Sequence, residues 1–562
     1  MRPPILIICA LAVACSASDP QEKTEKKSGD DVNWEGNGAP PELPDETTTL
    51  LGARIRRLTN SEYDAAVFEL LGIDTKPSSS FNQDVRQSGY ARNETQVVDA
   101  ILAGQYSDAA QALAREAVTS HYDRIVPCAE KTDDCGFKFI DSFGPRVYRG
   151  AFDEERRERI IEVFRAGANE GEFEIGVELV ITAALQSPFF LYHIEIGPGA
   201  LEATGNGPVL MAQHEIANSI SFLLTGGPPD AALRAAAENW ELGDADARVA
   251  QAERLLATPA AEAQLRRMII EWVGLNGFNN KGKDAVVYPD FLDYRDSMIV
   301  ETNQFIEEVL FKRDGTLQTL LGADFSVVDD KMSEFYGLSS TGVVQFDSLE
   351  RRGILNHASW LAATGHGDDS GPVVRGLKLL KKVLCASVPG HAQLGVAAPF
   401  PPNDGLTSAR SRIETHASEP ACASCHNVID QVGFTFENYD GMGRIRTDDN
   451  GVAVDTNGEL ASAASQWGVE STSGVFENSQ QLINVLQDSD DVRRCFAQNV
   501  VRFAAATRVE DIEDDFVIDQ QDWTKDIKGN IQQLFIAHVR DSSFPYRSPT
   551  PPIATFIDDV FQ

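Results

Sequence analysis

The residues with the clearest chemical meaning are two cysteines, followed directly by a histidine: Cys422, Cys425 and His426. This is the sequence pattern of a covalent haem attachment site. One helical turn separates the cysteines, so both thiols can form thioether bonds with the haem vinyl groups while the imidazole reaches the iron. The pattern therefore predicts one covalently bound haem c, with His426 as the proximal iron ligand.

Two other kinds of site use a cysteine pair at this spacing. Half of a zinc site would need a second cysteine pair to complete four ligands, and the sequence has none nearby. A redox-active dithiol is expected in a thioredoxin-like βαβ context, which the sequence does not indicate. Haem is the preferred interpretation, with zinc and a dithiol as the alternatives.

The second axial ligand of the iron decides between an electron carrier and an enzyme. An iron with both axial positions filled transfers electrons, whereas an iron with an open axial position can bind peroxide or oxygen. Met442 is the only methionine after the motif and could supply a thioether. His416 precedes the motif and could complete bis-histidine ligation. A distant histidine or an open position is the third alternative.

The N-terminus predicts export and a lipid anchor. Arg2 precedes an apolar run, residues 5–14, which has the length of a signal peptide and is too short to span a membrane. Small residues before Cys15 are similar to a bacterial lipobox, so Cys15 is the expected lipidation site and lipid the only membrane attachment. Ser16 favours the outer membrane or cell surface, with a periplasm-facing position as the alternative. Export agrees with haem attachment, which takes place outside the cytoplasm.

Four further cysteines are candidates for disulfides in an oxidising compartment. Cys128 and Cys135 enclose a short polar loop, which favours a local bridge over two free thiols. Cys385 and Cys495 remain once the haem has taken its pair. A bridge between them would tie the region before the haem to the helix after it, but the sequence does not set their distance.

Charge and composition limit the possible partners. The chain has 562 residues, with 85 acidic and 49 basic side chains and a formal net charge of −36. Such a charge repels phosphate backbones, which argues against nucleic-acid binding, and is typical of a solvated acidic surface. The 42% apolar content is enough for several folded domains.

The elements that must position these residues are predicted to be mainly α-helical. Thr59 to Glu62 form a capping box, and Gly72 is a stop signal. Residues 443–460 are the exception, because two Asn-Gly turns beside β-prone runs predict a small hairpin. Short amphipathic helices, packed as in bundles, are expected at 54–72, 107–118, 153–167, 174–185, 212–224, 247–256, 260–273, 294–310, 374–384, 479–486 and 491–506.

The stretch from Cys422 to Arg446 strongly resembles the planctomycete-type cytochrome c domain. This domain occurs in multi-module surface proteins of planctomycetes, verrucomicrobia and myxobacteria that were long described as domains of unknown function. Flanking segments resemble the other modules in the family's order, and the resemblance covers nearly all of residues 48–545. Among these segments are Arg57-Leu58-Thr59-Asn60-Ser61-Glu62-Tyr63, Leu185-Gln186-Ser187-Pro188, Glu215-Ile216-Ala217, Val374-Arg375-Gly376 and Cys495-Phe496. Gln431 departs from the family, which usually has proline there.

The resemblance adds to the expected site and domain organisation. Family members commonly have a histidine at the position of His416, whereas varied residues occur at the position of Met442. The resemblance therefore raises the preference for His416 as distal ligand to about the level of that for Met442. The expected parts of the chain are a signal peptide (1–15), an acidic tether (16–47), and helical modules at 48–125, 126–200 and 205–340. A cytochrome c-like haem module (350–465) and a C-terminal helical module (475–545) follow.

The expected function is electron transfer by an exported monohaem c-type cytochrome-like protein with an unidentified redox partner protein. One alternative is a haem oxidoreductase, for instance peroxidase-like, with an open distal site. Another is a structural or glycan-binding surface lipoprotein in which haem is secondary. Whether the protein is an enzyme is open, since the family's role is unsettled and the resemblance implies no substrate.

Overall fold

The computed structural model describes residues 41, 43–44, 50–169, 172–198, 207–346, 351–389, 403–418, 420–506 and 529–548. The predicted signal peptide and the lipidation site Cys15 lie outside the described residues, as does nearly all of the tether. Within the described ranges, no helix is both long and apolar enough to cross a membrane.

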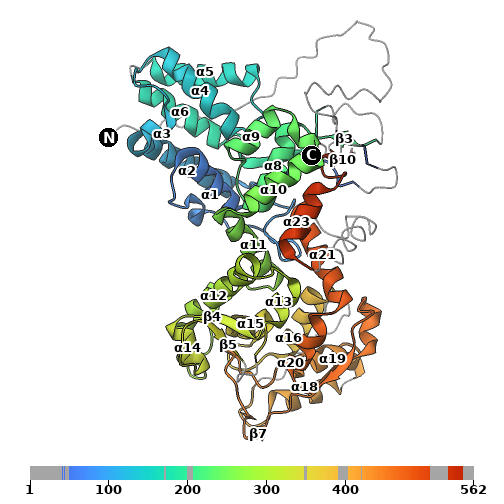
Figure 1. Ribbon diagram of the computed structural model, residues 1–562. Coiled ribbons are helices and arrows are strands. Elements are labelled where there is room, and N and C mark those ends of the chain that lie inside the picture. The colour runs from blue at the N-terminus through green and yellow to red at the C-terminus, as the bar shows by residue number, and fades with distance from the viewer. Residues whose placement is uncertain are drawn as a thin grey trace. The chain divides into compact units, whose positions relative to one another are not determined.

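Helices make up most of the described chain, which confirms the mainly α-helical fold (Figure 1). The first group is α1 (Asn60–Leu71), α2 (Ala100–Ser120), α3 (Tyr122–Ile125), α4 (Asp133–Val147), α5 (Glu154–Ala168), α6 (Phe173–Leu185) and α7 (Pro188–Leu191). The second is α8 (Gln213–Thr225), α9 (Ala231–Glu238), α10 (Ala245–Leu256), α11 (Pro259–Trp272), α12 (Phe291–Glu307), α13 (Leu317–Gly322) and α14 (Asp330–Tyr336). The third is α15 (Ala358–Thr364), α16 (Pro372–Lys378), α18 (Ala409–Ala417), α19 (Pro420–Phe434), α20 (Ser479–Leu486), α21 (Asp490–Ala505) and α23 (Ile531–Arg540).

The predicted helices are present, with bounds shifted by a few residues. The capping box at α1 is confirmed: Glu62 N–H donates to Thr59 Oγ1 at 3.2 Å, and Thr59 N–H donates to Glu62 Oε2 at 2.9 Å. Gly72 ends this helix in the left-handed conformation, with φ 76°. Residues 54–57, expected at the start of the helix, instead form a strand. Among the described helices, those without a predicted counterpart are α3, α4, α7, α9, α13, α14, α15, α18, α19 and α23.

The strands form two-stranded antiparallel sheets throughout the described residues. β1 (Arg54–Arg57) pairs with β2 (Tyr192–Glu195), and β3 (Val209–Leu210) pairs with β10 (Tyr546–Arg547). The remaining pairs are β4 (Phe325–Val328) with β5 (Gly342–Gln345), β6 (Asp448–Asp449) with β7 (Val452–Ala453), and β8 (Gly458–Leu460) with β9 (Gly474–Phe476). Two of these pairings therefore join segments that lie far apart in the sequence.

The predicted hairpin after the haem motif is present but shorter than expected. Asn450 and Gly451 have φ values of 54° and 80°, as the tight turn between β6 and β7 requires. The second Asn-Gly pair does not close a hairpin, because Gly458 begins β8, whose partner is β9.

Two large hydrophobic clusters organise the described residues. The smaller cluster combines apolar side chains of α1 to α7 with Phe222 of α8. The larger one takes side chains from α8 onward and includes Val428, Ile429 and Val432 of α19. The helix that carries the haem motif thus shares a core with helices that precede it by more than a hundred residues.

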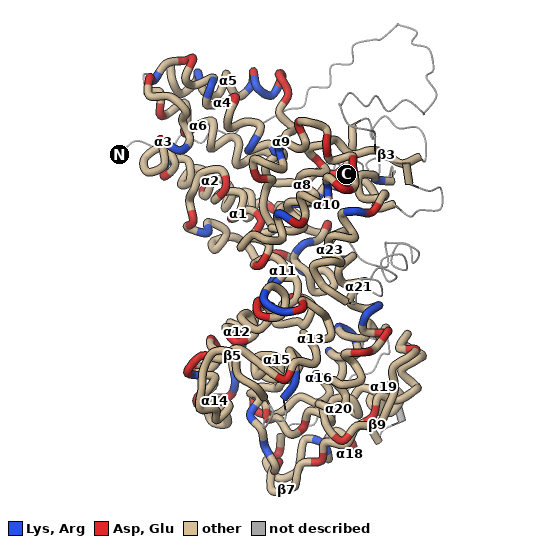
Figure 2. Tube along the Cα trace, viewed as in Figure 1, with Lys and Arg blue, Asp and Glu red and all other residues tan. Residues whose placement is uncertain are grey.

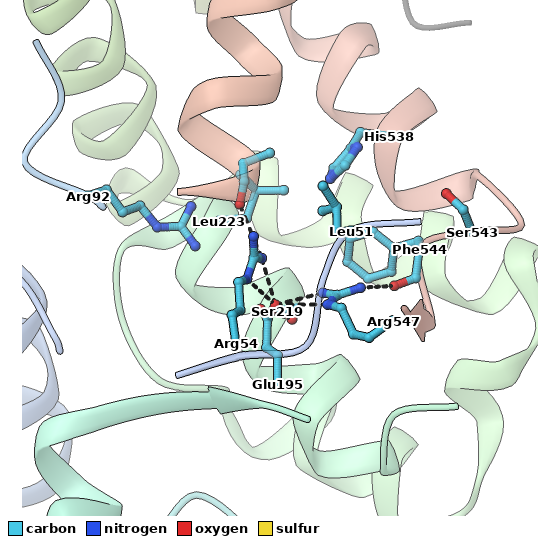
Figure 3. Close-up of a pocket in the computed structure, with 11 residues that line it drawn as sticks. Leu51, Arg54, Arg92, Glu195, Ser219, Leu223, His538, Ser543, Phe544 and Arg547 are labelled. Atoms are coloured by element: carbon cyan, nitrogen blue, oxygen red, sulfur yellow. Dashed lines mark hydrogen bonds and ion pairs between the residues drawn. The ribbon is translucent and has the colours of Figure 1, made fainter. Parts of the chain in front are cut away.

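Two buried carboxylates join distant segments. Glu195 accepts hydrogen bonds from Arg54 Nε at 2.6 Å and Arg547 Nη2 at 2.7 Å, and it also bonds Ser219 (Figure 3). His193 Nε2 donates to the same carboxylate at 2.8 Å. Burial raises the pKa of Glu195, but the arginines outweigh burial and hold this pKa well below its ordinary value. Because Arg54 lies in β1 and Arg547 in β10, this carboxylate ties the first described strand to the last.

The second buried carboxylate is Glu62. It pairs with Arg56 at 2.6 Å and with Arg92 at 3.3 Å. Burial raises the pKa of Glu62, but the two arginines outweigh burial and lower it to about 2.

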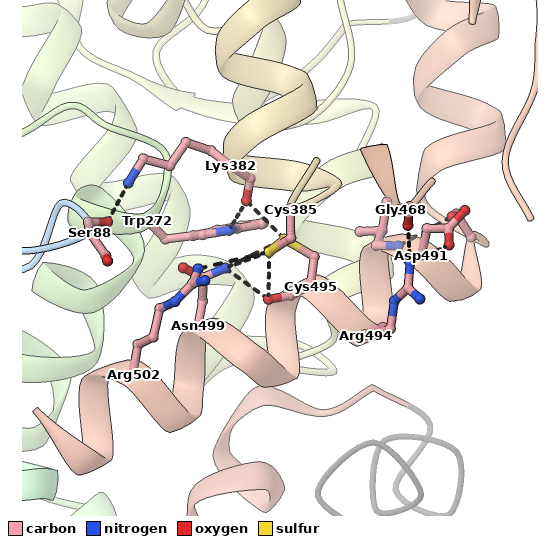
Figure 4. Close-up of a disulfide and its surroundings, with 12 residues drawn as sticks. Ser88, Trp272, Lys382, Cys385, Gly468, Asp491, Arg494, Cys495, Asn499 and Arg502 are labelled. Carbon is pink, nitrogen blue, oxygen red and sulfur yellow. Dashed lines mark hydrogen bonds and ion pairs between the residues drawn. A yellow bond between two sulfur atoms is a disulfide. The ribbon is translucent and has the colours of Figure 1, made fainter. Parts of the chain in front are cut away.

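The structure confirms both predicted disulfides. Cys128 is bonded to Cys135, and Cys385 is bonded to Cys495. The second bridge links the segment after α16 to α21, beside Trp272, whose indole N–H donates to the Lys382 carbonyl at 2.7 Å (Figure 4). It ties the region before the haem motif to the helix after it, as expected from the sequence.

Glycines allow α19 to pack closely against its neighbours. A Cβ at Gly433 would lie 1.8 Å from the Pro372 carbonyl oxygen of α16, and one at Gly376 would lie 2.0 Å from the Ile429 carbonyl oxygen. On another side, a Cβ at Gly458 of β8 would lie 2.1 Å from the Gln431 carbonyl oxygen. These backbone contacts leave no room for a side chain at the three positions.

Replacing Gly433 with alanine is expected to destabilise the fold by about 3 kcal/mol, because α16 and α19 must separate to admit the methyl group. Chemical denaturation of the purified protein measures this change in the free energy of unfolding. Gly104→Ala is the control, since Gly104 is exposed on α2 and a Cβ there meets nothing within 4 Å. That variant should gain about 0.5–1 kcal/mol. Equal stabilities of the two variants would contradict the close contact.

Glu62 should make the fold sensitive to acid. Its pKa is about 2 in the folded protein and 4.5 ordinarily, so its stabilising contribution is complete above pH 4.5 and is lost as the pH falls toward 2. Glu62→Gln should cost about 3–5 kcal/mol at neutral pH, because Arg56 and Arg92 lose their buried partner. The variant should also lose less stability than the unaltered protein between pH 5 and pH 2. Glu158→Gln, at an exposed position, should reproduce the unaltered pH profile in denaturation experiments.

Candidate functional site

The haem motif lies on α19, where its side chains share one face of the helix. Cys422, Cys425, His426 and Ile429 follow the three- and four-residue spacing that places side chains on neighbouring turns. Cys422 is 9% exposed, and Cys425 is partly buried against the larger core. Both thiols are free, whereas the other four described cysteines form disulfides. Two unpaired thiols therefore lie one turn apart, with an imidazole next to them.

A buried carboxylate sets the proton position on His426. The two carboxylate oxygens of Asp430 lie 3.1 Å and 3.0 Å from His426 Nδ1. A carboxylate can only accept, so Nδ1 carries the proton and Nε2 is left to bind a ligand. The hydrogen bond to Asp430 raises the pKa of His426 against the effect of burial. Burial raises the pKa of Asp430, although the bond from His426 opposes this.

His416 lies beside His426, and Met442 is held elsewhere. The ring centroids of the two histidines are 4.9 Å apart, with the ring planes at 78°. His416 is partly buried in the last turn of α18. Met442 is fully buried in the larger hydrophobic core, and its N–H donates to the Asp440 carboxylate at 2.9 Å. Of the two candidate distal ligands, the structure thus brings His416 into contact with the proximal histidine.

The helix that carries His416 is anchored by charge. Arg412 of α18 forms a buried ion pair with Asp369. The first N–H of the helix, at Ala409, donates to the Asp449 carboxylate of β6 at 2.7 Å. Arg410 covers the Phe434 ring of α19, with its guanidinium carbon 4.3 Å from the ring centroid. α18 carries both signs of charge and β6 is acidic (Figure 2). These contacts hold α18 against the segment before α16, the hairpin and α19.

A buried arginine holds the loop that follows α19. Arg375 of α16 donates to the carbonyl oxygens of Phe436 at 2.9 Å, Tyr439 at 3.0 Å and Asp440 at 2.7 Å. These carbonyl oxygens lie beyond the end of α19 and give the fully buried guanidinium the several acceptors that it needs. The loop that carries Met442 is fixed in this way.

The alternatives to haem find little support in the geometry. In the part of the chain that the structure describes, no group of three or more histidine, cysteine, aspartate or glutamate side chains is arranged to hold a metal ion. Helix α19 follows another helix, α18, and not a strand as in a thioredoxin-like dithiol site.

The chemistry of the donor set fits a c-type haem. Two free thiols one turn apart can form the two thioether bonds, and His426 offers Nε2 while Asp430 holds its other nitrogen. A second imidazole stands beside the first. A haem here would supply one-electron redox chemistry.

Part of the site was not foreseen from the sequence. Asp430 was not recognised as the partner of His426, although its position four residues later on a helix is a usable signal. The anchoring pair of Arg412 and Asp369 joins residues far apart in the sequence and leaves no local pattern. The predicted module boundaries stay predictions.

Four family models match the chain, in sequence order. They are PSD3 (DUF1587) at residues 56–119, PSD5 (DUF1595) at 135–195, PSD4 (DUF1592) at 211–338 and PSCyt3 (DUF1588) at 351–449, each described as a protein of unknown function. The last match contains the cysteine pair and both histidines of the site. No curated protein and no solved structure matches the chain. These four models describe the planctomycete cytochrome c-type domains, and the chain therefore belongs to the planctomycete-type cytochrome c family.

Proposed function

We propose that this protein binds one haem c covalently through Cys422 and Cys425, with His426 and His416 as the axial ligands, and that it transfers electrons. The observation that carries the proposal is the contact between the two imidazoles beside two free thiols. An iron with both axial positions filled passes electrons and has no open position for peroxide or oxygen. The peroxidase-like alternative is therefore less favoured.

His416 is the proposed distal ligand because of where its helix holds it. The ion pair of Arg412 with Asp369 and the bond from Ala409 to Asp449 fix α18, so His416 is held beside His426. Met442 would have to leave the hydrophobic core, where it is fully buried. Extracting such a side chain costs about 2–5 kcal/mol, by analogy with deleting one from a core.

The chain's own residues perform three tasks in this proposal. Asp430 fixes the tautomer of His426, so that Nε2 faces the iron. The larger core packs against Cys425 and limits the access of water. Arg375 fixes the loop after α19 and so holds the far end of that helix.

The proposed location is outside the cytoplasm, with a lipid at Cys15 as the membrane attachment and a redox partner protein that is not identified. Two disulfides in the fold support this proposal, since such bonds persist in oxidising compartments.

Covalent haem is tested by producing the chain with a working haem-attachment system and staining a denaturing gel for haem. The unaltered protein should keep its haem under denaturing conditions. The double variant Cys422→Ala, Cys425→Ala should lose the stain completely, because no thioether can form. Cys128→Ala, Cys135→Ala is the matched control, which removes a cysteine pair elsewhere and should keep the stain. An unaltered protein without stain would refute the proposal.

The distal ligand is tested by absorption spectra of the ferrous protein with and without carbon monoxide. The unaltered protein should be low-spin and unchanged by the gas, since both axial positions are filled. His416→Ala should become high-spin and bind carbon monoxide. Met442→Leu, which conserves volume in the core, should behave like the unaltered protein. If Met442→Leu, and not His416→Ala, became high-spin and bound carbon monoxide, Met442 would be the distal ligand. Binding of carbon monoxide by the unaltered protein would favour the enzymatic alternative.

A further inference from the structure

We infer that Asp430 is a positioning residue that lowers the reduction potential of the haem by accepting a hydrogen bond from His426. The inference rests on the proposed function, because it concerns the same haem, but it assigns a role to a residue outside the attachment motif. It also predicts the direction in which the site is tuned.

The geometry of the pair carries the inference. His426 Nδ1 lies almost equally far from both oxygens of Asp430, at 3.1 Å and 3.0 Å, so the N–H points at the whole carboxylate. Asp430 is 2% exposed, and the His426 side chain is 12% exposed. Little water can compete for either partner, and an ionic hydrogen bond is stronger in such surroundings than at the surface.

A carboxylate acceptor changes the electron density of the ligand. It draws the Nδ1 proton toward itself and leaves more negative charge on the ring, which makes Nε2 a stronger donor to a metal. A stronger donor stabilises ferric iron more than ferrous iron, because the ferric state carries one more positive charge. The reduction potential therefore falls, and hydrogen bonding around the ligands is one of the levers by which proteins set it.

The fold keeps this pair in place. Asp430 and His426 are four residues apart on α19, so the helix alone brings them together. The backbone contacts of Gly433 with Pro372 and of Gly376 with Ile429 flank Asp430 in sequence and hold that part of α19 against α16. These contacts hold the backbone of α19 in place on both sides of Asp430.

A general effect of negative charge near the haem is the competing explanation. Glu414 carries such a charge on α18, close in sequence to His416, and its side chain is 50% exposed. Water and salt screen an exposed charge strongly, so its effect on the potential should be small. Glu414→Gln is therefore the matched control for loss of one charge without loss of the bond to His426.

The test is a redox titration of the haem-loaded variants, followed by absorption. Asp430→Asn should shift the ratio of reduced to oxidised haem at least tenfold toward the reduced form at a fixed ambient potential, which is about 59 mV for a one-electron couple. Asp430→Glu keeps the carboxylate and should stay closer to the unaltered protein than Asp430→Asn does. Glu414→Gln should shift the ratio less than threefold. A haem-loaded Asp430→Asn protein with an unshifted ratio, or with a shift no larger than that of Glu414→Gln, would overturn the inference.

Failure of the proposed function has a different result, since the unaltered protein would then carry no covalent haem on a denaturing gel. The two failures are therefore distinguishable.

Discussion

The backbones of α16 and α19 touch with no side chain between them, and the candidate site depends on this contact. Gly376 and Gly433 permit it, and Arg375 on α16 reaches past it to the carbonyl oxygens after α19. The cysteines, His426 and Asp430 all lie on α19, so their positions follow from the position of one helix. A site built on a packed helix is held more firmly than one built on a loop. His416 is the one member contributed by another element, and α18 has its own anchor in the pair of Arg412 and Asp369.

The four family matches do not each build a hydrophobic core of their own. The two N-terminal family matches share the smaller core, and the two later ones contribute to the larger core. Glu195 bonds Arg54 and Arg547 at the two ends of the described chain. A buried charge without a partner costs several kcal/mol, so each such pair strongly favours one arrangement of the segments it joins. Each core therefore spans two family matches, and the main division between the cores falls between the second and the third match.

The sequence predicts features that depend on short-range patterns. The haem motif, the capping box of α1 and the Asn450-Gly451 turn each have a local signature. Helices α18 and α19 were not predicted, because α18 is mostly polar and α19 carries polar and sulfur-containing residues of the motif among its buried positions, which obscures the apolar period. The roles of Arg375, Gly376 and Gly433 could not be predicted, since each depends on a partner distant in the sequence. The bridge between Cys385 and Cys495 was expected only as one of two alternatives for the same reason.

Two features of the proposed site affect its reduction potential in the same direction. A methionine thioether as distal ligand would favour ferrous iron, so a histidine in its place lowers the reduction potential. The bond from His426 to Asp430 favours ferric iron and lowers the potential as well. Burial acts in the opposite direction, because a low dielectric penalises the additional charge of ferric haem. Asp430 offsets that penalty, since its own negative charge is buried beside the site and compensates the positive charge gained on oxidation. The proposed site is therefore better suited to giving up an electron than a buried haem with no carboxylate beside its histidine ligand.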